Sequence, residues 1–380
     1  MIDSNSILKP NGYDFIALVH SSWHLDSLTT WLYDKNLVGL VIIMPQSNIG
    51  NGDFYRLQIE DVLSINLMKE CTVIKYNNHF KSSKKNFIKS LLSRIIQKPC
   101  ADKNIFLLSA MDVNLSLLAK ISHLFKVDYV VLDEGNGSYF SFKEFSYRKS
   151  ALKFGSHNIR TYIYTYRSVI VKFIKNLAVD LMKVNVNKWD FFRCEDKSAE
   201  LTVNPIFCTA LKCILSERVT LKKSNINKSD IGKAALVFVD FNVTDEKIMA
   251  GLIEKIIAEI RYHDENRTIY IKPHPNSEIH KYISSKEDVI LVEGSINGEE
   301  LAIMLNPKII FGGWSSVTYH LPYLVDAPIV AFCPLYLNEL SLKPYNKVFI
   351  KQLTAKMDFL PNLHTVDCIE NIQSIISSKL

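Results

Sequence analysis

Short apolar runs recur along this chain, and the interval between one run and the next leaves room for a helix. In the first half the runs lie at residues 13–20, 38–44, 71–76, 105–109 and 129–132. In the second half they lie at residues 234–240, 269–271, 289–292 and 308–311. Strands that alternate with helices at this spacing are typical of a parallel, doubly wound α/β sheet. We therefore predict the α/β fold class.

The length of the chain suggests two such sheets. With 380 residues, of which 48% are hydrophobic and 22% charged, the chain can form two domains with separate cores. Polar segments at 193–200 and 222–232 suggest a change of domain near residue 200. We expect an N-terminal domain over 1–200 and a C-terminal domain over 201–380. The segment 367–380 is predicted to be a closing helix and is a candidate to pack back on the first domain.

The cysteines and the apolar runs indicate the compartment. The seven cysteines are scattered and show no Cys-x-x-Cys spacing, so we expect reduced thiols and neither a disulfide framework nor a zinc site. No apolar run reaches the roughly 18 to 20 residues that span a bilayer, and no secretory signal is visible. These features favour a cytosolic protein. The net charge of +6 is modest, and we expect no nucleic-acid partner.

A lysine and a histidine follow the apolar run at residues 269–271. The sequence there is Lys272-Pro273-His274-Pro275, in which two prolines remove backbone donors and stop both strand and helix. The carboxyl ends of parallel strands are where α/β sheets bind ligands. Lysine and histidine can both donate charge-assisted hydrogen bonds, which suits a phosphate. The alternative is a proline-rich connector whose histidine faces solvent.

An acidic turn follows the run at residues 129–132. It reads Asp133-Glu134-Gly135-Asn136-Gly137-Ser138-Tyr139, and its glycines would let a ligand approach the backbone. A carboxylate beside a second carboxylate, and partly buried, has a raised pKa and can serve as a general base. The alternative is an acidic turn without a chemical role.

A pair of serines follows the run at residues 308–311, after two glycines and a tryptophan. We predict a helix from Val317, so that Ser315 and Ser316 lie where backbone N–H groups and the helix dipole favour an anion. The alternative is simple capping of the helix by one serine.

Near the start of the second half, Thr244 is the expected cap of another helix. Asp240-x-Asn242-x-Thr244 lacks the glycine and glutamate of a calcium loop, so we predict no calcium site there.

Two stretches combine apolar residues with basic ones. The stretch 81–98 repeats apolar residues at helical spacing and carries Lys84, Lys85 and Lys89 among its cations, with no acid. The stretch 160–188 repeats this pattern, with one acid at Asp180. Each could be a packed helix with a solvated basic face, or a surface for anionic lipid or a polyanionic substrate.

Three motifs together resemble those of bacterial sialyltransferases. The motifs are Asp133-Glu134-Gly135, Lys272-Pro273-His274-Pro275 and Ser315-Ser316, in this order and each after a predicted strand. Their extended forms look most like the capsular polysialyltransferases, followed by the lipooligosaccharide sialyltransferases. The resemblance rests on about two dozen of the residues, together with the order of helices and strands between them.

The resemblance implies a fold of the GT-B type, in which two Rossmann-like domains face a central cleft. It also implies CMP-sialic acid as the donor, inversion at the anomeric carbon, and no metal or other cofactor. Glu134 would then be the base, with Asp133 and Gly135 beside it, and His274 would meet the donor phosphate. The other implied donor-binding residues are Lys272, Pro275, Ser315 and Ser316, with Glu299 holding the cytidine ribose.

The acceptor implied is an anionic oligosialic or polysialic glycan. In that case Lys84, Lys85 and Lys89 would form a cationic track for it, and the enzyme would work at the inner face of the cytoplasmic membrane, within reach of a capsule-assembly complex. Three alternatives stay open: a lipooligosaccharide sialyltransferase that adds one residue, a teichoic-acid-type glycerophosphotransferase that uses CDP-glycerol, and a non-catalytic nucleotide or polyanion binder.

Overall fold

The structure is a computed structural model of the chain. It describes residues 13–19, 21–43, 71–75, 106–110, 128–133, 147, 150, 151, 153, 154, 158–181, 186–194, 201–221, 226–240, 243–274, 277–283, 288–292, 296–340, 342 and 344–379. The chain forms two compact units. Of the described residues, those up to 133 and those from 170 to 190 belong to the first unit, and those from 147 to 169 and from 191 onward belong to the second. Each unit is described by itself.

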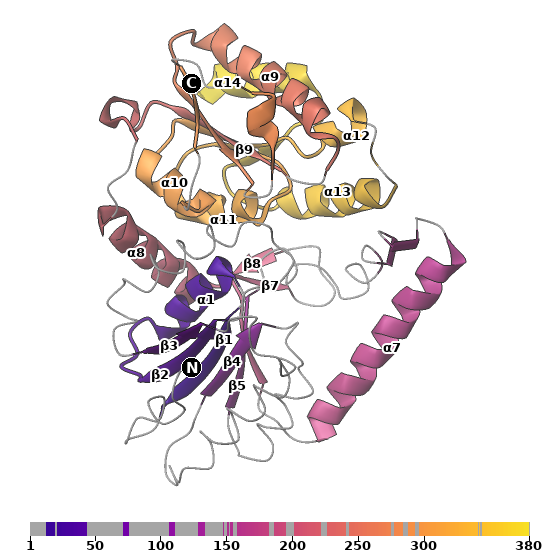
Figure 1. Ribbon diagram of the computed structural model, residues 1–380. Coiled ribbons are helices and arrows are strands. Elements are labelled where there is room, and N and C mark those ends of the chain that lie inside the picture. Colours follow the sequence, from indigo (N-terminus) through magenta and orange to yellow (C-terminus); the bar gives the residue numbers. More distant parts are fainter. Residues whose placement is uncertain are drawn as a thin grey trace. The chain divides into compact units, whose positions relative to one another are not determined.

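The first unit contains a six-stranded parallel sheet in the order β3-β2-β1-β4-β5-β6 (Figure 1). This is the strand order of a Rossmann fold. The strands are β1 (Phe15–Val19), β2 (Gly39–Ile43), β3 (Thr72–Lys75), β4 (Phe106–Ala110), β5 (Asp128–Leu132) and β6 (Val186–Trp189).

Strands β1 and β2 are buried over their whole length, as expected for strands covered on both faces. Gly39 is needed in β2, because a Cβ atom there would lie 1.9 Å from the Phe15 ring. Helix α1 (Ser22–Leu32) follows β1 and begins at Ser21, whose hydroxyl accepts a hydrogen bond from the His24 N–H. Trp31 of this helix packs edge-on against Phe15 and Phe106. These contacts join the helix to the central strands β1 and β4.

The second unit repeats this design with a six-stranded parallel sheet in the order β11-β10-β9-β12-β13-β14 (Figure 1). Its strands are β9 (Ala235–Val239), β10 (Ile269–Pro273), β11 (Val289–Leu291), β12 (Ile309–Gly312), β13 (Ile329–Ala331) and β14 (Leu363–Thr365). Its helices are α8 (Pro205–Leu221), α9 (Glu246–His263), α10 (Gly298–Leu305), α11 (Ser316–Leu324), α12 (Leu335–Glu339), α13 (Pro344–Met357) and α14 (Ile369–Lys379).

The core of the second unit lies between its sheet and the amphipathic faces of its helices. Leu236, Tyr270 and Ile310 from three neighbouring strands pack with Leu301 and Leu321 from helices α10 and α11. On α9 the buried residues recur at helical spacing, from Met249 to Ile260. The closing helix α14 contacts α9 within this unit. Its predicted packing on the first domain stays a prediction, as does the domain boundary near residue 200.

Two further elements lie outside the large sheets. A short antiparallel pair joins β7 (Phe192–Cys194) to β8 (Leu201–Val203). Helix α7 (Ile159–Leu181) coincides with most of the second basic stretch. Among the helices of the described part of the chain, none is long and apolar enough to cross a bilayer.

The structure confirms the predicted α/β class, with two Rossmann-like sheets as in the GT-B type. A central cleft between them stays a prediction. Two details differ from the sequence analysis. Asp245, and not Thr244, caps α9, and its carboxylate accepts a hydrogen bond of 2.9 Å from the Lys247 N–H. Helix α11 begins at Ser316, one residue before the predicted Val317, so the serine pair contains both the cap position and the first helical residue.

Candidate active site

Three neighbouring strands of the second sheet end in the residues of interest. Strand β10 ends in Lys272-Pro273 and continues into His274, and strand β12 continues through Gly313 and Trp314 into Ser315. Between them lies β9, which Asp240 follows directly. The order of strands reverses between β9 and β12, and α/β sheets bind ligands at such a switch point. The structure therefore brings the histidine motif and the serine pair to one edge of one sheet.

His274 is half-buried and is neutral at pH 7. Burial, followed by the nearby charge of Lys272, lowers the pKa of His274 to about 4. The Lys272 side chain is itself buried, with 7% exposure, which keeps its charge close to the histidine. A neutral imidazole donates one hydrogen bond and accepts another. An anion that arrives here would offset the charge of Lys272, which favours protonation of His274.

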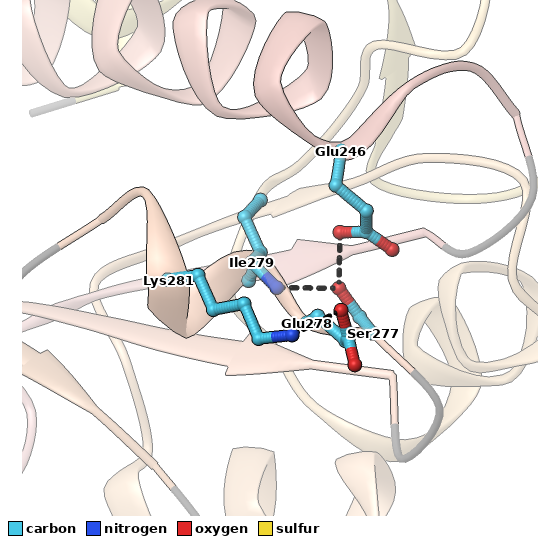
Figure 2. A network of polar contacts seen from close by, with 5 residues as sticks. All are labelled: Glu246, Ser277, Glu278, Ile279 and Lys281. Carbon is cyan, nitrogen blue, oxygen red and sulfur yellow. Dashed lines mark hydrogen bonds and ion pairs between the residues drawn. The ribbon is translucent and has the colours of Figure 1, made fainter.

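The turn after His274 is held at both sides by hydrogen bonds. The His274 N–H donates to the carbonyl of Val239 at the end of β9 (3.1 Å), and the Ser277 N–H donates to the His274 carbonyl (2.8 Å). Figure 2 shows how Ser277 is fixed: its hydroxyl donates to the carboxylate of Glu246, at 2.7 Å, and accepts from the Ile279 N–H. Glu246 is the first residue of α9. These hydrogen bonds tie His274 directly to strand β9 and, through Ser277, to helix α9.

The serine pair has the geometry of an anion site. Ser315 occupies the cap position of α11, but its side chain makes no capping hydrogen bond to the described helix backbone. Simple capping therefore does not explain the pair. The first N–H groups of a helix, its positive dipole end and two hydroxyls together suit a phosphate.

Asp240 anchors the loop that carries the serines. One carboxylate oxygen, Oδ2, accepts hydrogen bonds from the Trp314 N–H at 2.6 Å and from the Tyr336 hydroxyl at 2.7 Å. The Ser315 backbone also hydrogen-bonds to Asp240. The carboxyl is 4% exposed, and its burial raises its pKa to about 6 in spite of these bonds. The other oxygen, Oδ1, has no partner among the described residues.

The close packing around Asp240 requires a glycine beside it. A Cβ atom at Gly313 would lie 1.8 Å from the Asp240 Oδ2 atom and 2.5 Å from the Tyr336 hydroxyl. Since real Cβ atoms do not approach other atoms so closely, the loop needs glycine at this position. This packing thus explains why the second position of the sequence Gly-Gly-Trp-Ser-Ser is a glycine.

Glu299 lies at the start of α10, as predicted, and is buried. Its Oε1 atom is 2.8 Å from Nδ1 of His320 on α11, and the His320 ring contacts the ring of Phe191. The next residue, Glu300, pairs with Arg218 of α8 at 3.1 Å, and both side chains are buried. The two glutamates thus join α10 to α11 and to α8. The assignment of Glu299 to a ribose stays a prediction.

The acidic motif lies in the first unit. Asp133 directly follows β5, is fully buried, and its N–H donates to the Ser27 hydroxyl of α1 at 3.1 Å. Its partners Glu134 and Gly135 lie outside the described residues, as do Pro275 and the three lysines Lys84, Lys85 and Lys89. The roles of all these residues stay predictions.

The sequence analysis missed Asp240, Tyr336 and the Arg218–Glu300 pair. Asp240 carries a usable signal, because an aspartate directly after a fully apolar strand lies at the edge where ligands bind. Tyr336 and Arg218 have no such signal, since each reaches its partner from a distant helix. Among the described residues, no group of three or more His, Cys, Asp or Glu could hold a metal ion, and independence of metal stays a prediction.

Comparison with known proteins identifies one family. The model of a family described as alpha-2,8-polysialyltransferase matches residues 15–333 of the chain. This range contains all three motifs. No curated protein matches the chain.

Several solved structures are similar in part. The UDP-GlcNAc 2-epimerase of Methanocaldococcus jannaschii is 13% identical, with a TM-score of 0.47 over 96% of this chain and 92% of that one. The heptosyltransferase WaaC of E. coli is 10% identical, with a TM-score of 0.40 over 96% and 100% of the two chains. Acinetobacter baumannii MurG is 7% identical, with a TM-score of 0.41 over 96% and 90%. These values say nothing about substrate or reaction.

Proposed function

Since the chain belongs to the alpha-2,8-polysialyltransferase family, we propose that it moves sialic acid from CMP-sialic acid to the end of an oligosialic or polysialic acceptor. The observation that carries the proposal is the family match, which spans the acidic, histidine and serine motifs together. The chain is accordingly a glycosyltransferase. The donor, the acceptor and the stereochemistry are the parts that we propose.

The reaction requires one proton to leave the acceptor and negative charge to be stabilised on the leaving group. The acceptor hydroxyl oxygen attacks the anomeric carbon of sialic acid, and the bond from that carbon to the CMP phosphate breaks, so that the configuration inverts. Glu134 accepts the proton of the hydroxyl, and the phosphate keeps the electron pair. Asp133, the preceding residue in the sequence, is fully buried, and its N–H donates a hydrogen bond to the Ser27 hydroxyl.

The edge of the second sheet is suited to the departing CMP. Lys272 and His274 at the end of β10, and Ser315 and Ser316 at the start of α11, supply donors to a phosphate. His274 is neutral in the free protein, with its pKa near 4. As the phosphate gains charge during departure, the N–H of the neutral imidazole can stabilise that charge by donating a hydrogen bond. These groups act without a metal in our proposal.

Glu299 is the residue that we assign to the cytidine ribose. It begins α10, and its pairing with His320 fixes the carboxylate on one side. One oxygen, Oε1, takes part in that contact, which leaves the carboxylate able to accept from a ribose hydroxyl with its other oxygen. Glycine at position 298 allows the close packing of this helix start, since a Cβ there would lie 2.9 Å from Phe238 and Val317.

The proposed acceptor is an anionic glycan. Lys84, Lys85 and Lys89 would guide a chain that carries one carboxylate per sugar, and such guidance weakens as salt shortens the Debye length. Replacing the three lysines with glutamine should raise KM for long acceptors far more than for the shortest usable primer. We place the enzyme in the cytoplasm, on the inner face of the cytoplasmic membrane, where a capsule-assembly complex could receive the product.

The test compares donors and acceptors side by side. CMP-sialic acid and CDP-glycerol are each incubated with an oligosialic acceptor and with a galactose-terminated one, and release of CMP is measured. We expect release only with CMP-sialic acid and the oligosialic acceptor, at a rate that a chelator leaves unchanged. Release from CDP-glycerol, or transfer of a single residue to galactose alone, would overturn the proposal. So would binding of CMP-sialic acid without any transfer.

A further inference from the structure

Helix α7, labelled in Figure 1, exposes large apolar side chains to solvent, unlike an ordinary surface helix. In most surface helices the apolar stripe faces the core and the polar face meets water. Among the α7 side chains that the structure describes, Thr161 and Thr165 are buried, at 0% and 3% exposure. The Thr165 hydroxyl donates to the Thr161 carbonyl at 2.7 Å, so this buried hydroxyl is satisfied within the helix.

The other side of α7 is apolar and exposed. Its large side chains recur at the spacing of helical turns and therefore share one face. They are 48% to 74% exposed, and they comprise Ile159, Ile163, Ile170, Phe173, Ile174 and Leu177. We call these six residues the apolar face of α7. Three tyrosines in the first half of the helix, at positions 162, 164 and 166, are also exposed.

The charges of α7 indicate which kind of partner the apolar face can bind. The helix contains four basic residues (Arg160, Arg167, Lys172 and Lys175) and one acid (Asp180), a net charge of +3. Arg160 and Arg167 are exposed. Arg160 directly follows Ile159, and Arg167 lies four positions after Ile163 and three before Ile170. A hydrophilic polyanion could satisfy the cations but would leave the isoleucines and the phenylalanine in water. A second copy of the helix would cover the apolar face but would bring two equal positive charges together.

We infer that the apolar face of α7 rests on an anionic lipid surface. Acyl chains would cover the six apolar side chains, and anionic headgroups would pair with the arginines beside them. Tyrosine is enriched at the interface between membrane and water, which fits the three exposed tyrosines. The inference depends on neither the donor nor the acceptor, so its failure would leave the proposed reaction untouched. It would give the peripheral location proposed above a defined contact surface.

The test measures co-sedimentation of the full chain with vesicles. One set is made of phosphatidylcholine mixed with phosphatidylglycerol, and the other of phosphatidylcholine alone. The variant Phe173→Ser/Ile174→Ser removes the centre of the apolar face. The matched control Phe359→Ser/Ile248→Ser replaces the same two residue types at positions that are also exposed, in the second unit.

We expect the wild type and the control to sediment with the anionic vesicles, and the α7 variant to bind at least about ten-fold more weakly. Arg160→Gln/Arg167→Gln should weaken binding roughly thirty-fold on anionic vesicles, and much less on phosphatidylcholine alone. This second variant keeps the inference testable if the serine variant does not fold. Equal binding by the α7 variants and the wild type would overturn the inference. So would a wild type that binds no vesicle, or one that forms a dimer in light scattering that the serine variant loses.

Discussion

Burial of the Asp240 carboxyl makes the stability of the protein depend on pH in a definite direction. Its pKa is about 6 in the folded chain, against an ordinary value of 3.8. The unfolded chain therefore releases this proton at a lower pH than the folded chain does. Below about pH 4 this group makes its full contribution to the free energy of unfolding. The contribution decreases as the pH rises to about 6, and above that pH the free energy of unfolding no longer changes because of this group. The gap of about two pH units corresponds to a loss of roughly 3 kcal/mol.

Asp240→Asn isolates this effect. The amide has the size of the carboxyl and keeps an oxygen that can accept from the Trp314 N–H, but it does not ionise. Any loss at Tyr336 is the same at every pH. We therefore expect the free energy of unfolding of the variant, minus that of the wild type, to rise by about 3 kcal/mol between about pH 4 and about pH 6.5. Urea denaturation followed by tryptophan fluorescence at a series of pH values measures this difference.

A second variant checks the cause. The Tyr336 hydroxyl donates to the Asp240 carboxylate and lowers its pKa, so Tyr336→Phe should raise that pKa further. The loss of stability in this variant should then continue above pH 6. The reasoning is refuted if the difference between Asp240→Asn and the wild type is constant across the range. A difference that grows in favour of the wild type as the pH rises would refute it as well.

Four further variants test the site and its support. Glu134→Gln should keep donor binding and lower transfer by about 100-fold or more, measured as CMP release, because an amide cannot accept the proton. If the variant keeps more than about a tenth of normal turnover, the base is Asp133 or a histidine. His274→Ala should lower turnover by about 100-fold, since a donor aimed at developing charge is commonly worth about 3 kcal/mol, and a normal rate would end its assignment to the phosphate. Arg218→Ala should destabilise the protein by about 3 to 5 kcal/mol in urea denaturation, because it leaves Glu300 charged and buried. The double variant Arg218→Met/Glu300→Leu should recover much of the lost stability. If it recovers none, the result would argue against the ion pair.

The fold was predictable from local signals. Each strand predicted from an apolar run is present, and the runs at 234–240 and 308–311 became the adjacent strands β9 and β12. Such runs show where strands are because burial on both faces demands continuous apolar residues. The short strands β13 and β14 were not predicted. They have only three residues each, which is too short for an apolar run to stand out, and β14 lies at the edge of the sheet.

The site was predictable only in part, for a physical reason. Lys272, His274 and the serine pair were found because each lies at or shortly after the carboxyl end of a strand that the apolar runs predict. The support of the site depends on contacts between distant residues. Asp240 receives the Tyr336 hydroxyl across 96 positions of sequence, and Arg218 reaches Glu300 from another helix. The orientation of α7 was not predictable either, since its spacing would ordinarily turn the isoleucines inward.

The measurement that tests the account most directly is the length of the product from a single fluorescent oligosialic primer supplied with CMP-sialic acid. We predict a ladder of products that lengthens with time, each step one sialic acid longer, and its loss in His274→Ala and Glu134→Gln. A product that stops after one added residue, or a primer that stays unchanged while CMP-sialic acid is present in excess, would contradict the assignment of the chain as an enzyme that elongates polysialic acid.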